Sequence, residues 1–307
     1  MFRRFQLRRF ERGSLYMILA MVVSTVFAFS IKSAMATVFL PLMVFLRFFL
    51  PFLLILPYFF FHFGEIREVQ LLKTGGHLLR ASFVVVSQYS LFYYFTKGSL
   101  TNGILLWNTS PLFIPIIMMI FYKHRTPTPI WMALFVAFLG VICILKPTNG
   151  VFDIFSIFGF LSGITVAFSQ VLYGVNRENE TLSQNVFFFF FYTSILSVLI
   201  LIVSFYIYGF RQILASSFYE HGLLVPALSV LVASFASIGN QVLRGKAYLT
   251  AKPASLAPYI YLSVVFAAII DVIQHPGSIH GFLFVLGMLL IFSGIFIEMF
   301  YSAKLSY

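Results

Sequence analysis

The stretch Val186–Tyr208, with the sequence VFFFFFYTSILSVLILIVSFYIY, decides the fold class of this chain. It contains no charged side chain. A helix needs about 20 mostly apolar residues to cross a bilayer, so this stretch predicts a transmembrane helix. The whole chain has the same character, because 61% of its 307 residues are hydrophobic and only 9% are charged. Soluble domains are about 25% charged, so the composition excludes a soluble enzyme.

Other segments of the same kind lie on both sides of this stretch. Together they predict ten transmembrane helices: Ser14–Met35, Pro41–Phe61, Leu78–Thr96, Ile104–Tyr122, Pro129–Leu145, Ile154–Tyr173, Val186–Tyr208, Leu223–Leu243, Ala254–Ile273 and Ile279–Tyr301. The connections are short and leave no room for a soluble domain. We therefore expect an all-α integral membrane protein. The triplet Ala34-Met35-Ala36 also imitates a signal-peptide cleavage site, but Lys32 interrupts that region and the apolar run is longer than such peptides have.

The basic residues predict how the bundle is oriented. If the helices alternate across the membrane, 14 of the 20 Lys and Arg residues fall on the side of the two termini. These are Arg3, Arg4, Arg8, Arg9, Arg12, Arg67, Lys73, Lys123, Arg125, Arg177, Arg244, Lys246, Lys252 and Lys304. Cytoplasmic loops are enriched in Lys and Arg, so we expect both termini in the cytoplasm. Topology thus accounts for the net charge of +11, and we expect the lipid bilayer rather than nucleic acid as a partner.

A short motif occurs twice, at equivalent places in the two halves of the chain. Lys97-Gly-Ser-Leu-Thr101 is followed 149 residues later by Lys246-Ala-Tyr-Leu-Thr250. This offset divides the ten helices into two groups of five, residues 1–148 and 149–307. Because five is an odd number, the second half must enter the membrane from the opposite side. Two inverted five-helix repeats are typical of secondary transporters, which bind substrate between the halves.

Five landmarks carry a resemblance to a known family: Phe45-Leu-Arg47-Phe, His77-Leu-Leu-Arg80, Ser110-Pro111-Leu-Phe, Lys146-Pro147 and Ala257-Pro258-Tyr259-Ile-Tyr261. In this order they resemble the drug/metabolite transporter superfamily, in its EamA-type branch. The second, third and fifth are most similar to the S-adenosylmethionine transporters of obligate intracellular bacteria. Ile260 departs from that pattern, since some relatives have a basic residue there.

The resemblance implies a fold and a function. The expected fold has a central cavity formed by helices one to four and six to nine, with helices five and ten outside. The expected function is import of S-adenosylmethionine in exchange for S-adenosylhomocysteine, across a bacterial inner membrane, by alternating access. The alternative is an exporter of amino acids or other small metabolites.

Arg47 is the first candidate for contact with the substrate. It lies about two turns into the second predicted helix. A guanidinium group suits a substrate carboxylate, because its N–H donors match the two carboxylate oxygens. The alternative is that the side chain reaches to the outer interface or makes a structural hydrogen bond.

The other candidates are amides and aromatic rings within the apolar segments. Aromatic faces stack on adenine and attract a sulfonium cation, and amides pair with the adenine edge. These candidates are Gln88, Tyr93, Trp107, Asn108, Gln170, Tyr173, Asn240, Gln241 and Tyr259. The alternative for Tyr and Trp is a place in the interfacial belt, and for small polar residues it is helix packing. We expect an adenine-bearing amino-acid derivative as the substrate.

The sequence offers no chemistry for an intramembrane enzyme. It has no His-Glu-x-x-His motif, and its six histidines are expected at loops or helix ends. Cys143 is the only cysteine, so the cysteine-based metal patterns are missing. We expect no catalytic residue, metal or cofactor. Among the acidic residues only Asp271 and Glu298 fall within predicted helices, near their ends, which favours exchange over proton coupling.

Overall fold

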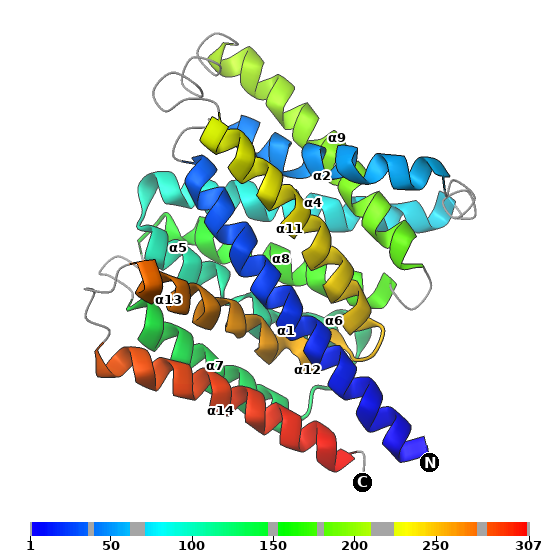
Figure 1. Cartoon of the computed structure of the whole chain (residues 1–307), viewed down its shortest axis with the longest axis vertical. Coiled ribbons are helices and arrows are strands. Elements are labelled where there is room, and N and C mark those ends of the chain that lie inside the picture. Colours follow the sequence, from blue (N-terminus) through cyan, green and yellow to red (C-terminus); the bar gives the residue numbers. More distant parts are fainter. Residues whose placement is uncertain are drawn as a thin grey trace.

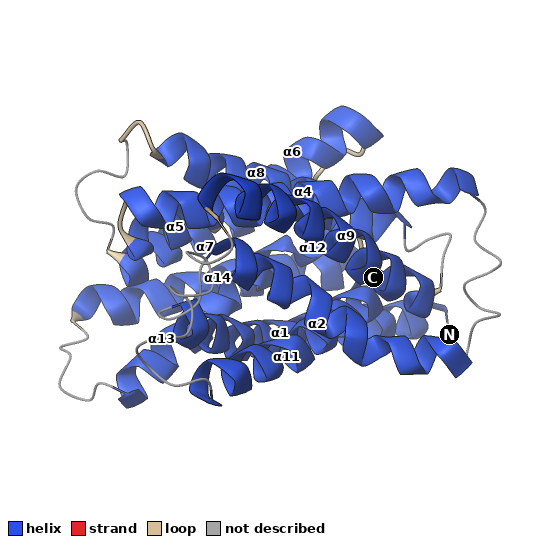
Figure 2. Cartoon of the chain, turned by 90° about the horizontal axis from the view of Figure 1, so that it is seen from above, coloured by secondary structure: helices blue, strands red, loops and turns tan. Residues whose placement is uncertain are grey.

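The computed structural model describes residues 2–35, 40–61, 71–146, 153–176, 181–209, 224–274 and 281–305. Every regular element in these ranges is a helix, which confirms the all-α class (Figure 1; Figure 2). The elements are α1 (Phe2–Met35), α2 (Leu40–Phe61), α4 (Leu71–Lys97), α5 (Leu100–Trp107), α6 (Ser110–Tyr122), α7 (Thr128–Leu145), α8 (Ser156–Asn176), α9 (Leu182–Tyr208), α11 (Leu224–Tyr248), α12 (Pro253–Leu256), the 3-10 helix η1 (Ala257–Tyr261), α13 (Leu262–Gln274) and α14 (Phe282–Leu305).

In the described part of the chain, nine helical segments are long and apolar enough to cross a membrane. They correspond to nine of the ten predicted helices. The third predicted helix, α4, is 27 residues long but is not among the nine. Its polar residues, including Arg80, Ser87 and Gln88, lower its hydropathy, and all three side chains are buried. α4 packs along α8 and α9, where Ser87 donates to the Ser162 backbone of α8 and Arg80 donates to Asn185 of α9.

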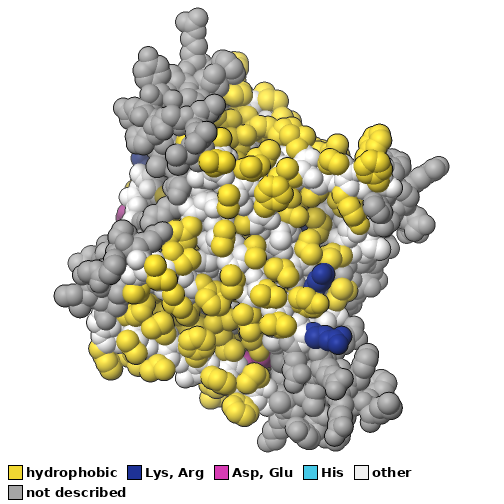
Figure 3. All heavy atoms as spheres, in the orientation of Figure 1, with side chains coloured by type: hydrophobic (Ala, Val, Ile, Leu, Met, Phe, Trp, Pro, Cys, Tyr) yellow, Lys and Arg dark blue, Asp and Glu magenta, His cyan; other side chains and the backbone are white. Residues whose placement is uncertain are grey.

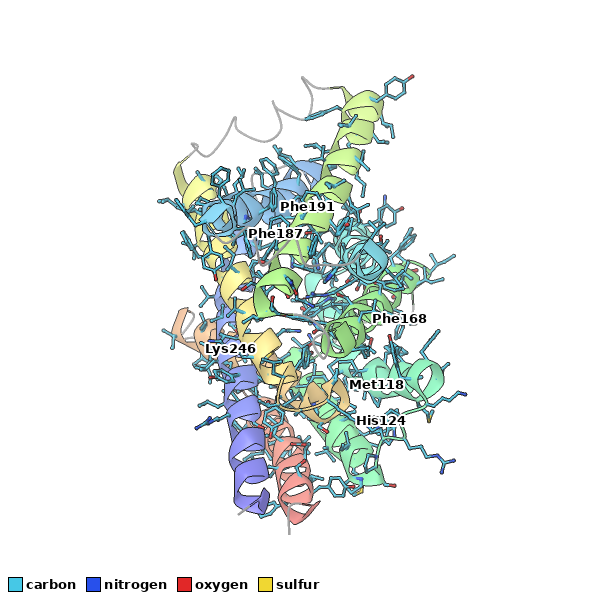
Figure 4. The ribbon with its side chains drawn as sticks, turned by 90° about the vertical axis from the view of Figure 1, so that its right-hand side faces the viewer. Met118, His124, Phe168, Phe187, Phe191 and Lys246 are labelled. Atoms are coloured by element: carbon cyan, nitrogen blue, oxygen red, sulfur yellow. The ribbon has the colours of Figure 1, made fainter. Side chains whose placement is uncertain are left out.

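The start of α9 shows how local sequence sets a helix end. Thr181 is the N-cap: its side-chain oxygen accepts the backbone N–H of Gln184 at 3.2 Å. The side-chain oxygen of Gln184 accepts the backbone N–H of Thr181 at 3.0 Å. These two bonds satisfy N–H groups that a helix leaves unpaired at its start. The phenylalanine run follows, and Phe187 and Phe191 (labelled in Figure 4) contact the Phe52 ring of α2.

Two of the predicted transmembrane helices are interrupted. The fourth is divided at Asn108 and Thr109 into α5 and α6, and Pro111 lies in the first turn of α6. The ninth is divided into α12, η1 and α13, with Pro258 in η1. Proline interrupts helical bonding because it has no N–H and its ring clashes with the preceding turn. In transporters, interrupted helices border the substrate path.

Helices from the two halves of the chain pack side by side. α1 lies along α11, α4 along α8, α2 along α9, and α7 along α14. Figure 1 shows α2 and α9 towards one edge of the molecule and α7 and α14 at the other. The start of α1 and the end of α14 lie at the same end of the bundle. The predicted boundary between residues 148 and 149 lies outside the described residues, as do Arg67, Arg177 and Arg211.

The outer surface of the bundle is apolar. Large hydrophobic side chains are exposed on it, including Phe60 at 79% and Tyr206 at 92%. Figure 3 shows hydrophobic side chains over much of the coloured face, with few Lys or Arg side chains between them. Exposed apolar area of this extent is rare in soluble monomers and suits contact with lipid. The chain is therefore a multi-pass membrane protein.

Candidate functional site

Arg47 lies two turns into α2 and is partly buried. Its guanidinium carbon is 4.4 Å from the ring centroid of Phe27 in α1 and 5.4 Å from that of Phe48. Its buried Nε atom has no hydrogen-bond partner among the described residues. The two rings stabilise the cation, while the N–H donors remain suited to an anion. Binding of a substrate carboxylate at Arg47 stays a prediction, and this geometry is compatible with it.

Three more predicted contact residues each have a buried polar atom that no described residue pairs. These atoms are Gln88 Oε1, Trp107 Nε1 and Asn108 Oδ1. The hydroxyl of Tyr89, beside Gln88, is in the same condition. Buried polar groups are nearly always hydrogen-bonded, since an unpaired one costs about 1–3 kcal/mol. Such atoms on α4 and at the end of α5 are compatible with contact to a polar ligand.

Local geometry orients the side chain of Asn108. Asn108 ends α5, and its side-chain N–H₂ donates to the backbone carbonyl of Ile104 at 2.9 Å. This bond leaves the amide oxygen as the unpaired atom. The backbone around the interruption packs closely on α8, where a Cβ on Gly163 would lie 2.7 Å from Thr109 Oγ1. The interruption and its polar side chain are thus held in place by the neighbouring helix.

A second group of polar residues joins four helices. Arg80 of α4 donates from Nη1 to Asn185 Oδ1 of α9, and from Nη2 to Gln241 Oε1 of α11 at 2.8 Å. Its guanidinium carbon lies 3.7 Å from the ring centroid of Tyr173 in α8 and 4.4 Å from that of Phe189 in α9. Tyr173 and Gln241 are predicted contact residues. Arg80 and Asn185 are not among the contact residues that the sequence predicts.

Two tyrosines extend this group along α8 and α11. Tyr173 donates its hydroxyl to the backbone carbonyl of Gln241 at 2.6 Å, and Tyr248 donates to Gln170 Oε1 at 2.8 Å. The two rings meet edge to face with centroids 5.5 Å apart. The structure thus brings the predicted residues Gln170, Tyr173 and Gln241 into one network. We call the set the four-helix cluster: Arg80, Gln170, Tyr173, Asn185, Gln241 and Tyr248.

The remaining predicted contact residues are Tyr93, Asn240 and Tyr259, and each has a protein partner of its own. Tyr93 is 41% exposed, with its ring against α8. Asn240 donates to the backbone carbonyl of Ala20 in α1 at 2.7 Å. Tyr259 is fully buried and donates to Glu298 Oε2 at 3.0 Å. The amide of Asn240 and the hydroxyl of Tyr259 therefore link helices in this structure.

Two expectations about the sequence are wrong. The charge count above places Arg244 in a loop, but α11 continues to Tyr248 and Arg244 is only 5% exposed. His77 is expected at a loop or a helix end, but it lies within α4, fully buried and stacked on Phe188 at 5.0 Å. A signal for Arg244 was available, because Gln241, Arg244 and Tyr248 follow each other at spacings of three and four, as on one helix face.

Comparisons with known proteins agree with this architecture. A profile of the EamA-like transporter family matches residues 11–146. This chain is a membrane transporter whose first half is similar to that family. The S-adenosylmethionine uptake transporter of Rickettsia felis is 25% identical over 230 residues, which cover 73% of this chain and 71% of that protein. A solved crystal structure with 13% identity covers 94% of this transporter and 98% of its own chain with a TM-score of 0.74, which shows a shared fold.

The family match and the named relative place this transporter outside the enzymes. Polar groups in its interior are therefore candidates for contact with a small-molecule substrate. The unpaired atoms of Arg47, Gln88, Trp107 and Asn108 come from α2, α4 and α5, which all lie in the first half of the chain. The four-helix cluster instead connects α4 to three helices of the second half. The unpaired atoms of the predicted contact residues thus lie on helices of the first half, whereas the four-helix cluster connects α4 with the second half.

Proposed function

We propose that this transporter carries S-adenosylmethionine into the cell in exchange for S-adenosylhomocysteine. The observation that carries the proposal is the set of unpaired buried polar atoms on Arg47, Gln88, Trp107 and Asn108. A guanidinium pairs with a carboxylate, an amide oxygen accepts the adenine amino group, and an indole stacks on a purine. S-adenosyl compounds contain all three partners. Aromatic faces also attract the sulfonium cation. The name of the Rickettsia felis relative supports the same substrate class.

Transport is proposed to proceed by alternating access between two inverted halves, residues 1–148 and 149–307. The helix contacts support this division. α1 lies along α11 as α4 lies along α8, which pairs the first helix of each half with the third helix of the other. α2 with α9 and α7 with α14 pair helices of equal position in the two halves. The fourth helix of each half is interrupted. The halves would rock about the site and open it to one side at a time.

The proposed location is a bacterial inner membrane, with both termini in the cytoplasm. The excess of Lys and Arg on one side of the predicted topology supports this orientation. Export of amino acids or other small metabolites is the alternative function. A guanidinium at Arg47 would serve either substrate class, because both contain a carboxylate. The partly buried indole of Trp107 and the unpaired amide oxygen of Gln88 favour a purine-bearing substrate.

Exchange in proteoliposomes tests this proposal. Purified protein is reconstituted into liposomes loaded with S-adenosylhomocysteine, and entry of labelled S-adenosylmethionine is measured. We expect saturable entry that depends on the internal S-adenosylhomocysteine and stops when the liposomes are empty. Trp107→Ala should slow this entry, whereas Tyr206→Ala, which changes a ring that is 92% exposed, should not. Entry of amino acids without any exchange of S-adenosyl compounds would establish the alternative function instead.

A further inference from the structure

Arg244 is a buried cation that the proposed site does not use. It lies in α11 and is 5% exposed. Its Nη2 lies 4.0 Å from the sulfur of Met21 in α1, and its Nε has no hydrogen-bond partner among the described residues. Met21 lies near the middle of the apolar segment Arg12–Ile31. The guanidinium group is therefore deep in the bundle, so it does not reach the membrane surface in the way that long basic side chains usually do.

The groups around Arg244 provide oxygen atoms and aromatic rings but no negative charge. Tyr248 lies one turn further along α11, and the ring of Tyr173 in α8 contacts the ring of Tyr248. The hydroxyl protons of these two tyrosines are donated to Gln170 and to the backbone of Gln241. No described Asp or Glu forms an ion pair with Arg244. A buried guanidinium normally has a carboxylate partner, because desolvating an unpaired charge is costly.

The position of Arg244 relative to Arg47 can be measured along α1. Arg47 contacts Phe27 of that helix, and Arg244 contacts Met21. The two contact residues are six positions apart, which corresponds to roughly 9 Å along a helix axis. Both guanidinium groups therefore lie against α1 at two different depths in the membrane. In the proposed topology Arg47 is the one nearer to the outside.

We propose that Arg244, which lies beside Tyr173 and Tyr248, is a second anion subsite that binds the carboxylate of the substrate deeper in the transporter than Arg47. This inference rests on the proposed function, since it concerns the same substrate. The carboxylate would pair with Arg47 when the site is open to the outside and with Arg244 before release to the cytoplasm. A bidentate pair with a carboxylate would satisfy Nε, the donor of Arg244 that has no partner among the described residues.

Paired ligands that differ only in the carboxylate test this inference. Equilibrium binding of S-adenosylmethionine and of its decarboxylated form is measured on purified full-length wild-type, Arg244→Gln, Arg244→Lys and Lys246→Gln proteins. Lys246 is the matched control, because its side chain carries the same charge, is exposed, and lies beside Tyr16 of α1 (Figure 4). Arg244→Gln should weaken binding of the carboxylate-bearing ligand by about tenfold or more and leave the decarboxylated ligand within about twofold.

The outcomes separate the possible failures. If Arg244→Gln weakens binding of both ligands equally, or of neither, the proposed subsite is wrong and the proposed function is unaffected. Wild-type protein that neither binds nor transports S-adenosylmethionine overturns the proposed function and the subsite together. If Arg244→Gln does not elute as a single species from a sizing column, Arg244→Lys decides. A lysine keeps the positive charge but lacks the planar guanidinium that pairs with both carboxylate oxygens. This variant should therefore discriminate less between the two ligands than the wild-type protein does.

Discussion

At the scale of single residues, the buried arginines differ in what already holds them. Arg80 donates to two amide oxygens and lies over the rings of Tyr173 and Phe189. Arg47 contacts two rings, and its buried Nε is unpaired within the described ranges. A guanidinium that is hydrogen-bonded to several helices stabilises their packing, whereas one with unpaired donors is suited to a ligand. Substitutions at Arg80 and Arg47 should therefore have different effects.

Arg47→Ala should abolish saturable uptake of S-adenosylmethionine in proteoliposomes. A hydrogen bond to a charged group contributes about 1.5–3 kcal/mol, which corresponds to a loss of affinity of roughly 10- to 150-fold. Yield and thermal stability should stay close to wild type, because no described protein group depends on a hydrogen bond from the Arg47 Nε. Arg47→Lys serves as the control and should keep part of the uptake. Uptake kinetics in Arg47→Ala equal to those of the wild type would show that Arg47 does not bind the substrate.

Arg80→Ala should lower the free energy of unfolding by on the order of 2–3 kcal/mol, because Asn185 and Gln241 lose their charged donor. Chemical unfolding in detergent measures this change. Lys97→Ala is the control, since Lys97 lies at the end of the same helix and is exposed. The control should change the unfolding free energy by less than about 0.5 kcal/mol. Equal stability of the two variants would mean that the four-helix cluster does not stabilise the bundle.

His124, labelled in Figure 4, lies in the connection between α6 and α7, outside the membrane-spanning segments. Its Nδ1 is 3.4 Å from Nζ of Lys252. Burial, and then the charge of Lys252, lower the pKa of His124 below its ordinary value of 6.5. The folded chain thus binds this proton less tightly than the unfolded chain does. Stability should therefore fall as the pH drops from above 6.5 towards the lowered value.

Lys252→Gln should raise the pKa of His124 part of the way, since burial of the ring remains. NMR titration of histidine-labelled protein measures this pKa, with His124→Gln to assign the signal. Lys123→Gln removes a neighbouring exposed charge and should leave the pKa unchanged. A pKa that does not move in Lys252→Gln would contradict the electrostatic contribution of Lys252.

At the scale of helices, glycines determine how closely α7 and α14 approach. A Cβ added to Gly287 would lie 2.7 Å from the backbone oxygen of Gly140, and one added to Gly140 would lie 2.5 Å from that of Gly287. Neither backbone oxygen can move without shifting its helix. Small residues that allow backbones to approach are typical of transmembrane helix pairs. This pair lies at the edge of the molecule in Figure 1, away from the candidate site.

Gly287→Ala should destabilise the transporter by about 1–3 kcal/mol, because overpacking a tight contact forces the backbones apart. Gly281→Ala is the control, since a Cβ there would meet no atom within 4 Å. Thermal unfolding in one detergent compares the two variants. Gly287→Ala protein that survives purification should transport substrate with an unchanged KM. A variant as stable as the wild type would show that α7 and α14 separate easily.

At the scale of the whole molecule, the paired helix contacts support two inverted halves, and the charge distribution predicts their orientation. The motif at Lys97–Thr101 lies where α4 ends and α5 begins. Its repeat at Lys246–Thr250 lies where α11 ends, just before α12. The connection between the third and fourth predicted helices of each half thus contains a similar motif. In inverted halves these two connections must lie on opposite sides of the membrane.

Labelling of single cysteines tests this topology. In a Cys143→Ser background, Lys97→Cys should react with a membrane-impermeant maleimide in intact cells. Lys252→Cys should react only after the membrane is permeabilised. Both lysines are exposed in the structure, so burial would not explain a difference between them. Reaction of both cysteines in intact cells would contradict the inverted arrangement.

The helices themselves could be predicted from the sequence because the bilayer imposes a local rule. A span must be apolar over about 20 residues, so Val186–Tyr208 identifies α9 without any knowledge of its neighbours. The rule fails where a helix continues past its apolar part. Arg244 ends the apolar stretch of α11, yet the helix runs one further turn to Tyr248. It also weakens for α4, whose polar side chains Arg80, Ser87 and Gln88 are buried against neighbouring helices.

The sequence by itself determined the membrane class, the positions of the spans and a set of polar residues that lipid does not tolerate easily. Only the tertiary structure decided which of these residues meet. Arg80 and Asn185 are 105 positions apart and form a hydrogen bond, whereas Tyr93 and Gln88 share a helix but differ in exposure. The physical reason is that spacing sets the relative angles of side chains on one helix. The rotation and neighbours of that helix depend on packing across the whole bundle.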